Sequence, residues 1–166
     1  NGYAMAAIIG RRSVMEAAQG TFISSTNWTE RIGPTAALAT IKKLVKTDTP
    51  GRLAKIGRSV KRAWEEASAK HGVPITVGGS DAIANFSFQG ADAQAQKTLF
   101  VQEMLAQGIL ASNLFFGTLA HTGAHVKRYA RAVDKTFAIL KKAIDTGTVR
   151  KLLKGPIAHT GFARLN

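Results

Sequence analysis

The fold is decided by residues 49–88, TPGRLAKIGRSVKRAWEEASAKHGVPITVGGSDAIANFSF. Thr49 suits the N-cap of a helix, and Pro50 suits its first turn, where the missing N–H of proline leaves no hydrogen bond unmade. Apolar side chains then recur at steps of three and four, and Gly72 ends the pattern. The residues on this apolar face are Leu53, Ile56, Val60, Ala63 and Ala67. We therefore predict an amphipathic helix whose opposite face is basic.

Two short strands are expected after this helix. Residues 73–78 and 83–88 are apolar or alternating runs, and Gly79, Ser80 and Asp81 between them are typical of a turn. The two runs together predict a pair of strands that can form a hairpin.

Three more elements complete the C-terminal part. We predict a helix over residues 94–107 that ends at Gly108, a third strand within 109–119 that Ser112 and Asn113 interrupt, and a long closing helix. The apolar face of the closing helix has a period of 3.6 residues and consists of Val126, Tyr129, Ala130, Val133, Phe137, Leu140 and Ile144. From about Thr47 onward, the pattern is that of an α+β layer with a small, mostly antiparallel sheet. We expect the tail, 151–165, to pack back on this fold.

The first 46 residues have a different pattern. The apolar run 4–10 predicts a buried strand, 11–18 a short helix, and 20–33 a polar loop. Pro34 suits the first position of a further helix, whose apolar face consists of Ala37, Leu38, Ile41, Leu44 and Val45. Because the first strand begins without the polar residues usual at a natural terminus, we expect the chain to be a fragment of a longer protein.

Composition limits the class of protein. The chain has 166 residues, of which 45% are hydrophobic and 20% charged, close to the average of globular proteins. It has no cysteine, so disulfides and thiolate metal sites are excluded. No apolar run approaches the ~20 residues that span a bilayer, and no secretory signal pattern opens the chain. We expect a soluble, cytoplasmic protein.

The net charge of +13 raises the question of a nucleic-acid partner. The basic helix faces within 42–62 and 127–131 could meet a phosphate backbone. The aromatic residues, however, are mostly spaced as core residues, and no RRM, KH or zinc-finger pattern is visible. Since a fragment can lack its acidic partners, the excess of lysine and arginine is also compatible with an unbalanced surface.

A loop rich in hydroxyl groups precedes the second helix. Residues 21–34 contain five hydroxyl side chains together with an asparagine, a tryptophan, a glutamate and an arginine. Hydroxyls and backbone amides near a helix N-terminus suit a phosphate, because both the donors and the helix dipole favour an anion. A capped, solvated loop is the alternative, since such residues favour turns in any case.

Histidines and a C-terminal arginine are further candidates for chemistry. His121 and His125 have the i, i+4 spacing of a helical metal pair, but Gly123 stands between them and no third ligand is evident, so we expect no metal site. His159 and Arg164 could approach a substrate carboxylate, which arginine binds in a two-pronged geometry, or they could lie on the surface.

The chain resembles class III aminotransferases, nearest to the branch of glutamate-1-semialdehyde 2,1-aminomutase. The blocks that carry the resemblance are NGYAMAAIIGRRSVME at 1–16, ISSTNWTERIG at 23–33, TAALAT at 35–40, MLAQGILA at 104–111, AHT at 120–122 and the helix containing Asp134. These blocks occur in the order expected for the family and span nearly the whole chain.

The resemblance implies an α/β fold, the C-terminal part of a fold-type I pyridoxal-phosphate-dependent transferase. Residues 1–46 then correspond to the end of the cofactor-binding large domain and a linking helix. Residues 47–166 correspond to the small α+β domain with its mostly antiparallel sheet. The intact protein is expected to be a homodimer with active sites shared across the interface.

The resemblance also implies a cofactor, pyridoxal 5'-phosphate, and residues that contact it. The family's Schiff-base lysine falls upstream of Asn1, so no catalytic residue is expected in this chain. The family's threonine that reaches the phosphate of the neighbouring subunit falls on Thr26, with Ser25 as the alternative. Gly2 and Tyr3 would line the substrate side beside the lysine, or simply pack at a strand end.

The function that follows from the resemblance is amino-group transfer to or from a keto or aldehyde substrate through a Schiff base, with the cofactor as electron sink. Without the lysine, the chain is expected to be inactive alone. An intramolecular aminomutase of the glutamate-1-semialdehyde type is the alternative within the family. A basic nucleic-acid-binding module or a non-catalytic structural module is the alternative of a different class.

Overall fold

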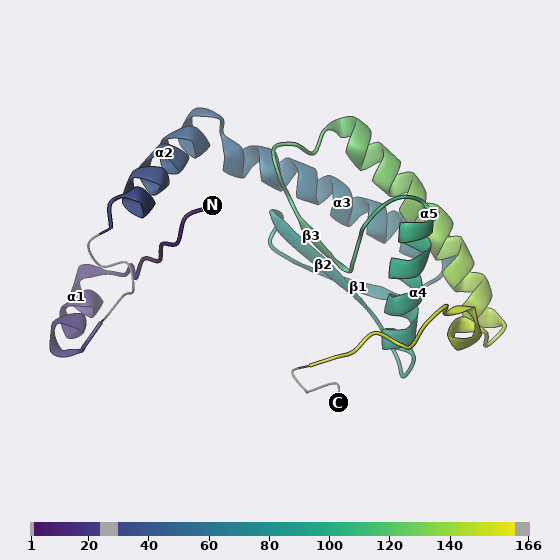
Figure 1. Ribbon diagram of the computed structural model, residues 1–166. Coiled ribbons are helices and arrows are strands. Elements are labelled where there is room, and N and C mark those ends of the chain that lie inside the picture. The colour runs from purple at the N-terminus through teal and green to yellow at the C-terminus, as the bar shows by residue number, and fades with distance from the viewer. Residues whose placement is uncertain (1, 24–29, 162–166) are drawn as a thin grey trace. The chain divides into compact units, whose positions relative to one another are not determined.

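The computed structural model describes residues 2–23 and 30–161. The chain divides into two compact units, Asn1–Thr49 and Pro50–Asn166, named unit 1 and unit 2 below (Figure 1). The assignment of residues 1–46 and 47–166 to a large and a small domain stays a prediction.

Unit 1 consists of two helices and extended chain. Helix α1 (Arg12–Met15) continues into a 3-10 helix (Glu16–Gly20), which agrees with the short helix predicted over 11–18. Helix α2 (Ile32–Lys46) forms as predicted and begins two residues before Pro34. Its predicted apolar face is mostly exposed among the described residues, as the accessibility of Leu38, Ile41 and Val45 shows.

The strand predicted over residues 4–10 is wrong. This segment has no regular secondary structure, and its side chains are exposed. A strand is stable only when a neighbouring strand takes up its backbone N–H and C=O groups. Within residues 2–23 and 30–49, no strand lies beside it. Apolar composition alone therefore misled the prediction.

Unit 2 contains the predicted order of elements. Helix α3 (Thr49–His71) ends immediately before Gly72, and strands β1 (Ile75–Gly79) and β2 (Ile83–Phe88) form the hairpin. Helix α4 (Ala93–Ala106), strand β3 (Leu114–Phe116) and helix α5 (Gly123–Asp145) follow, and a 3-10 helix (Val149–Leu152) comes after α5. The bounds of α3 and α4 lie within a few residues of their predictions, and α5 includes all of the apolar face predicted for the closing helix.

The sheet has three strands in the order β1-β2-β3, and both pairs are antiparallel. Ile75 lies opposite Phe88 in the hairpin, and Ile83 lies opposite Phe116 on the other side of β2. Alternate residues of the central strand, Ala84, Phe86 and Phe88, are buried. One face of the sheet therefore packs on the core, as the alternating sequence predicted.

The core of unit 2 is built around aromatic rings from one strand and three helices. The ring of Phe86 on β2 lies 4.9 Å from that of Trp64 on α3, 5.1 Å from that of Phe100 on α4 and 6.3 Å from that of Phe137 on α5. All four side chains are fully buried. Tilted and edge-on aromatic pairs at these separations add to the stability that burial provides. This cluster holds the three helices against the sheet.

Helix α3 approaches the hairpin turn very closely at Gly57. A Cβ atom at this position would collide with the backbone carbonyl of Asp81. The glycine therefore lets the helix pass over the turn, where Arg58 and Lys61 form ion pairs with the Asp81 carboxylate. Backbone contact and ion pairs together fix the turn on the helix.

The described part of the tail packs back on unit 2, as predicted. Val149 is buried, and Ile157 packs against the core. The side-chain amides of Gln94 and Gln102 on α4 donate to the carbonyls of Ala158 and Leu152. Figure 1 shows this tail, in yellow, running from α5 past the lower end of α4.

Candidate functional site

The residues predicted to contact the cofactor are mostly outside the described part of the chain. Thr26 and Ser25 fall within 24–29, so their predicted role is not tested. Gly2 and Tyr3 belong to the extended segment of unit 1. Gly2 has a φ of 95°, and Tyr3 is exposed. The substrate-lining role of Gly2 and Tyr3 stays a prediction.

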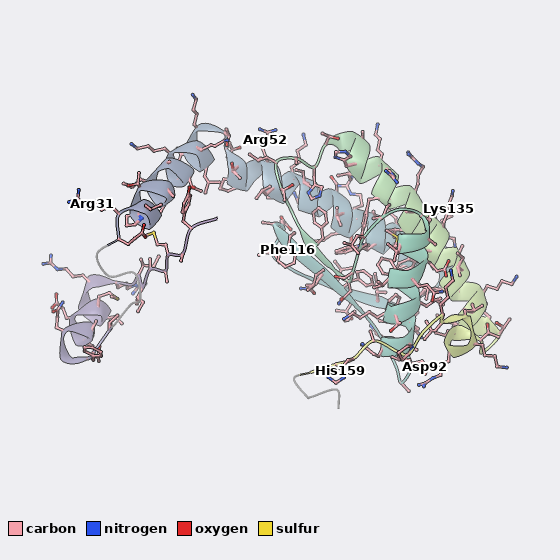
Figure 2. The ribbon with its side chains drawn as sticks, viewed as in Figure 1. Arg31, Arg52, Asp92, Phe116, Lys135 and His159 are labelled. Carbon is pink, nitrogen blue, oxygen red and sulfur yellow. The ribbon has the colours of Figure 1, made fainter. Side chains whose placement is uncertain are left out.

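The first turn of α2, which the sequence suggested as part of an anion site, is occupied by a side chain of the protein. The carboxylate of Glu30 accepts hydrogen bonds from the backbone N–H of Ile32 at 2.8 Å and of Gly33 at 3.3 Å. Pro34 has no N–H, and the N–H of Thr35 already donates to the Arg31 carbonyl. A carboxylate at this end of a helix is favoured by the helix dipole. Of the two alternatives, an anion site and a capped helix end, the structure supports the capped end for this turn. Figure 2 labels Arg31, which lies at this end of α2.

Gly33 also joins this turn to the N-terminal segment. A Cβ atom there would lie 3.1 Å from the Ala4 carbonyl oxygen and 3.3 Å from the Met5 Cβ. Gly33 is buried for this reason. The close contact places residues 4 and 5 against the start of α2, and the absence of a side chain at residue 33 makes it possible.

Unit 2 contains a groove of ≈ 620 Å³. Its walls come from the segment between α4 and β3, from β3 itself and from the first two turns of α5, and Val60 of α3 lies at its base. Most of the lining is apolar and includes Ile109, Leu110, Leu114, Phe115, Phe116 and Val126. A concave, mostly apolar surface of this size is typical of small-molecule sites in proteins.

The partly buried Tyr129 lines the groove, and its hydroxyl contacts the fully buried Trp64 behind it. The Trp64 indole N–H donates to the hydroxyl oxygen of Tyr129 at 2.8 Å. Burial raises the pKa of Tyr129 far above its ordinary value, and the hydrogen bond from Trp64 opposes this only partly. The phenol therefore keeps its proton over the physiological pH range.

The two histidines with i, i+4 spacing do not share a helix. His121 precedes α5, and its Nδ1 accepts a hydrogen bond from the Thr118 N–H at 3.1 Å. His125 lies in the first turn of α5, where it forms a capping box with Thr122. Both rings line the groove, and within the described residues no group of three His, Asp or Glu side chains could hold a metal ion.

Carboxylates in unit 2 are engaged by neighbouring cations. A hydrogen bond from Lys61, followed by one from Arg58, lowers the pKa of Asp81. Asp134 on α5 accepts from Lys70 and His71 of α3 at 2.8 Å each. The bond from Lys70 and then that from His71 lower the pKa of Asp134. These pairs tie elements together and lie apart from the groove lining.

The C-terminal candidates show no site in the described residues. His159 is exposed at the end of the described tail, which Figure 2 labels. The neighbouring Ala158 N–H donates to the Thr98 hydroxyl at 3.0 Å, so the backbone there is held against α4. Arg164 lies outside the described residues. Their approach to a substrate carboxylate stays a prediction.

Sequence reasoning missed the groove. Its lining comes from residues 108–116 and 121–129 together with Val60, segments that the chain brings together only in three dimensions. The single signal available beforehand was the interruption of the predicted third strand by Ser112 and Asn113. In the structure these two residues lie in the segment between α4 and β3, directly before β3, and Ser112 is part of the groove lining.

The helices of the described residues are too short or too polar to span a membrane.

Two curated relatives of the chain are aminotransferases. The chain is 27% identical over 138 residues to the 2'-deamino-2'-hydroxyneamine transaminase of Streptomyces kanamyceticus, a match that covers 80% of this chain and 35% of the relative. It is 25% identical over 150 residues to the 3-aminobutyryl-CoA aminotransferase of Cloacimonas acidaminovorans (strain Evry), covering 87% of this chain and 36% of the relative. No protein-family model matches the chain. The resemblance to aminotransferases is confirmed, and the chain spans little more than a third of either relative.

A solved structure shares the fold. The PLP internal aldimine form of the FumI protein from Sphingopyxis sp. MTA144 has a TM-score of 0.69 and 20% sequence identity to the chain. The match covers 83% of this chain and 34% of that one. This likeness confirms the predicted fold class, since the matched third of that chain belongs to a protein solved in its PLP internal aldimine form.

Proposed function

We propose that the chain is the C-terminal portion of a pyridoxal-phosphate-dependent aminotransferase that moves an amino group to or from a keto or aldehyde substrate. The observation that carries the proposal is the sequence relationship to two aminotransferases over at least 80% of the chain. The relationship runs across both units, so the proposal applies to the chain as a whole. A homodimer and a cytoplasmic location belong to the same proposal.

The donor chemistry of this chain fits a phosphate group. Ser24, Ser25, Thr26 and Thr29 supply hydroxyls that donate well to phosphate oxygens. The first amides of α2 do not add to these donors, because Glu30 already accepts from them. Thr26, with Ser25 as the alternative, is therefore the group that we propose holds the phosphate of the cofactor in the neighbouring subunit.

The cofactor, when bound, supplies the electron sink on which amino-group transfer depends, and the protein supplies binding and orientation. In this chain Thr26 would hold and orient the phosphate end. Glu30 keeps the start of α2 capped. Gly2 and Tyr3 would line the substrate side. The lysine that completes the reaction is proposed to lie upstream of Asn1.

Transfer between molecules is favoured over the intramolecular alternative. Both relatives are named as a transaminase or an aminotransferase, and neither as a mutase. An aminomutase would use the same cofactor and the same lysine, so the distinction depends on substrate retention. The amino donor and acceptor follow from assays on the complete enzyme.

The test begins with the coding sequence upstream of the Asn1 codon. The extended protein is expressed and incubated with pyridoxal 5'-phosphate, and its absorbance is recorded before and after borohydride reduction. We expect a visible band that reduction abolishes, and a single lysine upstream of Asn1 that carries the reduced cofactor in peptide mass spectrometry. A folded extended protein without such a lysine would overturn the proposal.

Variants of the extended protein test the role of the hydroxyl loop. Thr26→Ala is expected to weaken cofactor affinity by about tenfold or more, because a hydrogen bond to a charged group is lost. Thr21→Ala is the matched control, since the Thr21 hydroxyl already donates to the Ala18 carbonyl at 3.0 Å. If Ser25→Ala weakens binding and Thr26→Ala does not, the phosphate contact moves to Ser25. Equal affinity in all three variants would remove the loop from the cofactor site.

A further inference from the structure

We propose that the groove of unit 2 is a binding site for a small amphipathic carboxylate, a molecule with an apolar or aromatic body and one carboxylate group. The inference goes beyond amino-group transfer, and it does not depend on the cofactor. It stands on three features of the described residues: the shape of the groove, the exposure of its apolar wall and the nature of its polar groups.

The apolar wall leaves large side chains uncovered. Leu110, in the segment between α4 and β3, is 90% exposed, and Phe116, at the end of β3, is 60% exposed. Contact with the apolar body of a ligand would remove this surface from water, which is the main favourable contribution to such binding. The volume of ≈ 620 Å³ is within the range of small-molecule sites.

The polar side chains that line the groove are hydrogen-bond donors. Arg128 is cationic and exposed, and no aspartate or glutamate is among the described residues of the lining. The Nδ1 atom of His121 accepts from the Thr118 backbone, so its Nε2 is the protonated nitrogen in the neutral ring. Tyr129 accepts from Trp64 and keeps a proton of its own to donate. Such a lining suits a ligand group that accepts hydrogen bonds, and it suits a negatively charged group best.

The Arg128 guanidinium makes only long contacts to carbonyl oxygens, so it can form a stronger interaction with an anionic group. Its Nη2 lies 3.5 Å from the carbonyl oxygens of both Gln107 and Gly108, which is long for a hydrogen bond. Gly108 has a φ of 73°, and a Cβ atom there would lie 3.3 Å from the same nitrogen. The glycine thus allows the guanidinium to rest over the end of α4 beside the groove. A carboxylate is the ligand group that a guanidinium binds best, in a two-pronged geometry.

The binding experiment uses the 166-residue chain without cofactor and two matched probes. The probes are 4-phenylbutyrate and 4-phenylbutanol, which share an apolar body and differ in the carboxylate. Titrations are followed by ¹H–¹⁵N correlation spectra. We expect saturable shifts at amides of residues 108–116 and 121–129, with a dissociation constant for the acid on the order of 1 mM, as its number of atoms allows. The alcohol should bind about three- to tenfold more weakly, which is the range for an exposed to partly buried charge pair.

Three variants assign the binding to the groove. Arg128→Gln should remove the preference for the acid over the alcohol. Arg131→Gln is the matched control on the same helix, exposed but outside the groove lining, and should keep the preference. Leu110→Ser changes a side chain that makes no core contact, and it should weaken both probes.

The proposal is overturned if the folded chain shows no saturable shifts up to the solubility of the acid. It is overturned as well if the acid and the alcohol bind equally, or if Arg128→Gln retains the preference. Because the readout needs neither cofactor nor activity, a negative result leaves the proposed aminotransferase function standing. Failure of the lysine test likewise leaves the groove proposal standing.

Discussion

Helices α2 and α5 have the same kind of amphipathic sequence, yet they have different surroundings. In α5 the apolar face is covered, and Val133, Phe137 and Leu140 are fully buried. In α2, Ile41 is 56% exposed and Val45 is 77% exposed. The comparison shows that apolar periodicity determines that a helix forms and which face is apolar, whereas the partner of that face comes from elsewhere in the fold.

The same contrast holds for the two units as wholes. The cluster of buried hydrophobic residues is drawn entirely from unit 2, where three helices and a sheet enclose it. Among the described residues of unit 1, only Gly33 and Thr49 are buried. The stability of the chain should therefore depend on unit 2 far more than on unit 1, and the predictions below test this difference.

The largest effect is expected from emptying the core of unit 2. Phe137→Ala should lower the free energy of unfolding by about 3–5 kcal/mol, because a ring packed against Phe86, Phe88 and Phe100 is replaced by a cavity. Ile41→Ala, on the exposed face of α2, should change it by no more than about 0.5 kcal/mol. Urea denaturation followed by far-UV circular dichroism gives both values. If Ile41→Ala lowers the free energy of unfolding by as much as Phe137→Ala does, the apolar face of α2 is packed in solution.

A smaller effect is expected where the groove wall meets the core. Tyr129→Phe removes the acceptor of the Trp64 indole N–H, and Trp64 is fully buried. We expect a loss of about 1–3 kcal/mol, the cost of leaving a buried donor without a partner. The measurement is urea denaturation at pH 7 followed by tryptophan fluorescence. No loss of stability would mean that water replaces the phenol oxygen.

The same variant has a defined pH dependence. Since burial raises the folded-state pKa of Tyr129 above the ordinary value near 10, the unfolded chain loses this proton first. The stabilisation that the protonated Tyr129 hydroxyl gives the folded chain is therefore complete below about pH 10, and it is lost as the pH rises above this value. Relative to Tyr129→Phe, the wild-type chain should lose stability between about pH 10 and 11. If the difference in unfolding free energy between the wild type and Tyr129→Phe stays constant over this range, the raised pKa of Tyr129 is contradicted.

The smallest effects are expected from ion pairs, where the two units again differ. Asp134→Asn breaks the contacts to Lys70 and His71 and should cost at most about 1 kcal/mol at pH 7, because the pair is partly exposed. Glu16→Gln in unit 1 should change almost nothing, since Glu16 lies 3.9 Å from Arg12 and both side chains are solvated. Urea denaturation of the two variants beside the wild type measures both effects.

The contribution of Asp134 also depends on pH. Because Lys70 and then His71 hold its pKa below the ordinary value near 3.9, the stabilisation is present above about pH 4 and disappears as the pH falls below it. The stability difference between wild type and Asp134→Asn should therefore shrink as the pH falls below about 4. A difference that persists at the acid end would assign the effect to packing instead of charge.

Much of unit 2 could be predicted because its signals are local. The bounds of α3 and α4 follow from apolar spacing, from Pro50 at the start of α3, and from Gly72 and Gly108 at the ends, and the apolar face of α5 follows from its period. The hairpin follows from alternation on either side of a turn. Each of these signals involves residues that are within a few positions of one another in the chain, which is the range over which backbone geometry is set.

The site could be predicted only in part. The hydroxyl loop was recognised from composition and resemblance, but the capping of α2 by Glu30 depends on the orientation of one carboxylate. The groove combines Val60 of α3 with residues 108–116 and with the start of α5, and no spacing along the chain relates these segments. The run 4–10 was misread because apolar composition cannot say whether a neighbouring strand exists.

The sequence by itself determined the order of helices and strands in unit 2, the approximate bounds of α3, α4 and the hairpin strands, which helix faces are apolar, and the likeness to aminotransferases. Only the tertiary structure decided that the apolar face of α5 is covered while that of α2 is open, and that Arg128, His121 and Tyr129 meet in one apolar groove. The physical reason is the distance along the chain over which each kind of interaction acts. Periodicity and turn chemistry act over a few residues, whereas burial depends on segments that the folded chain brings together from far apart.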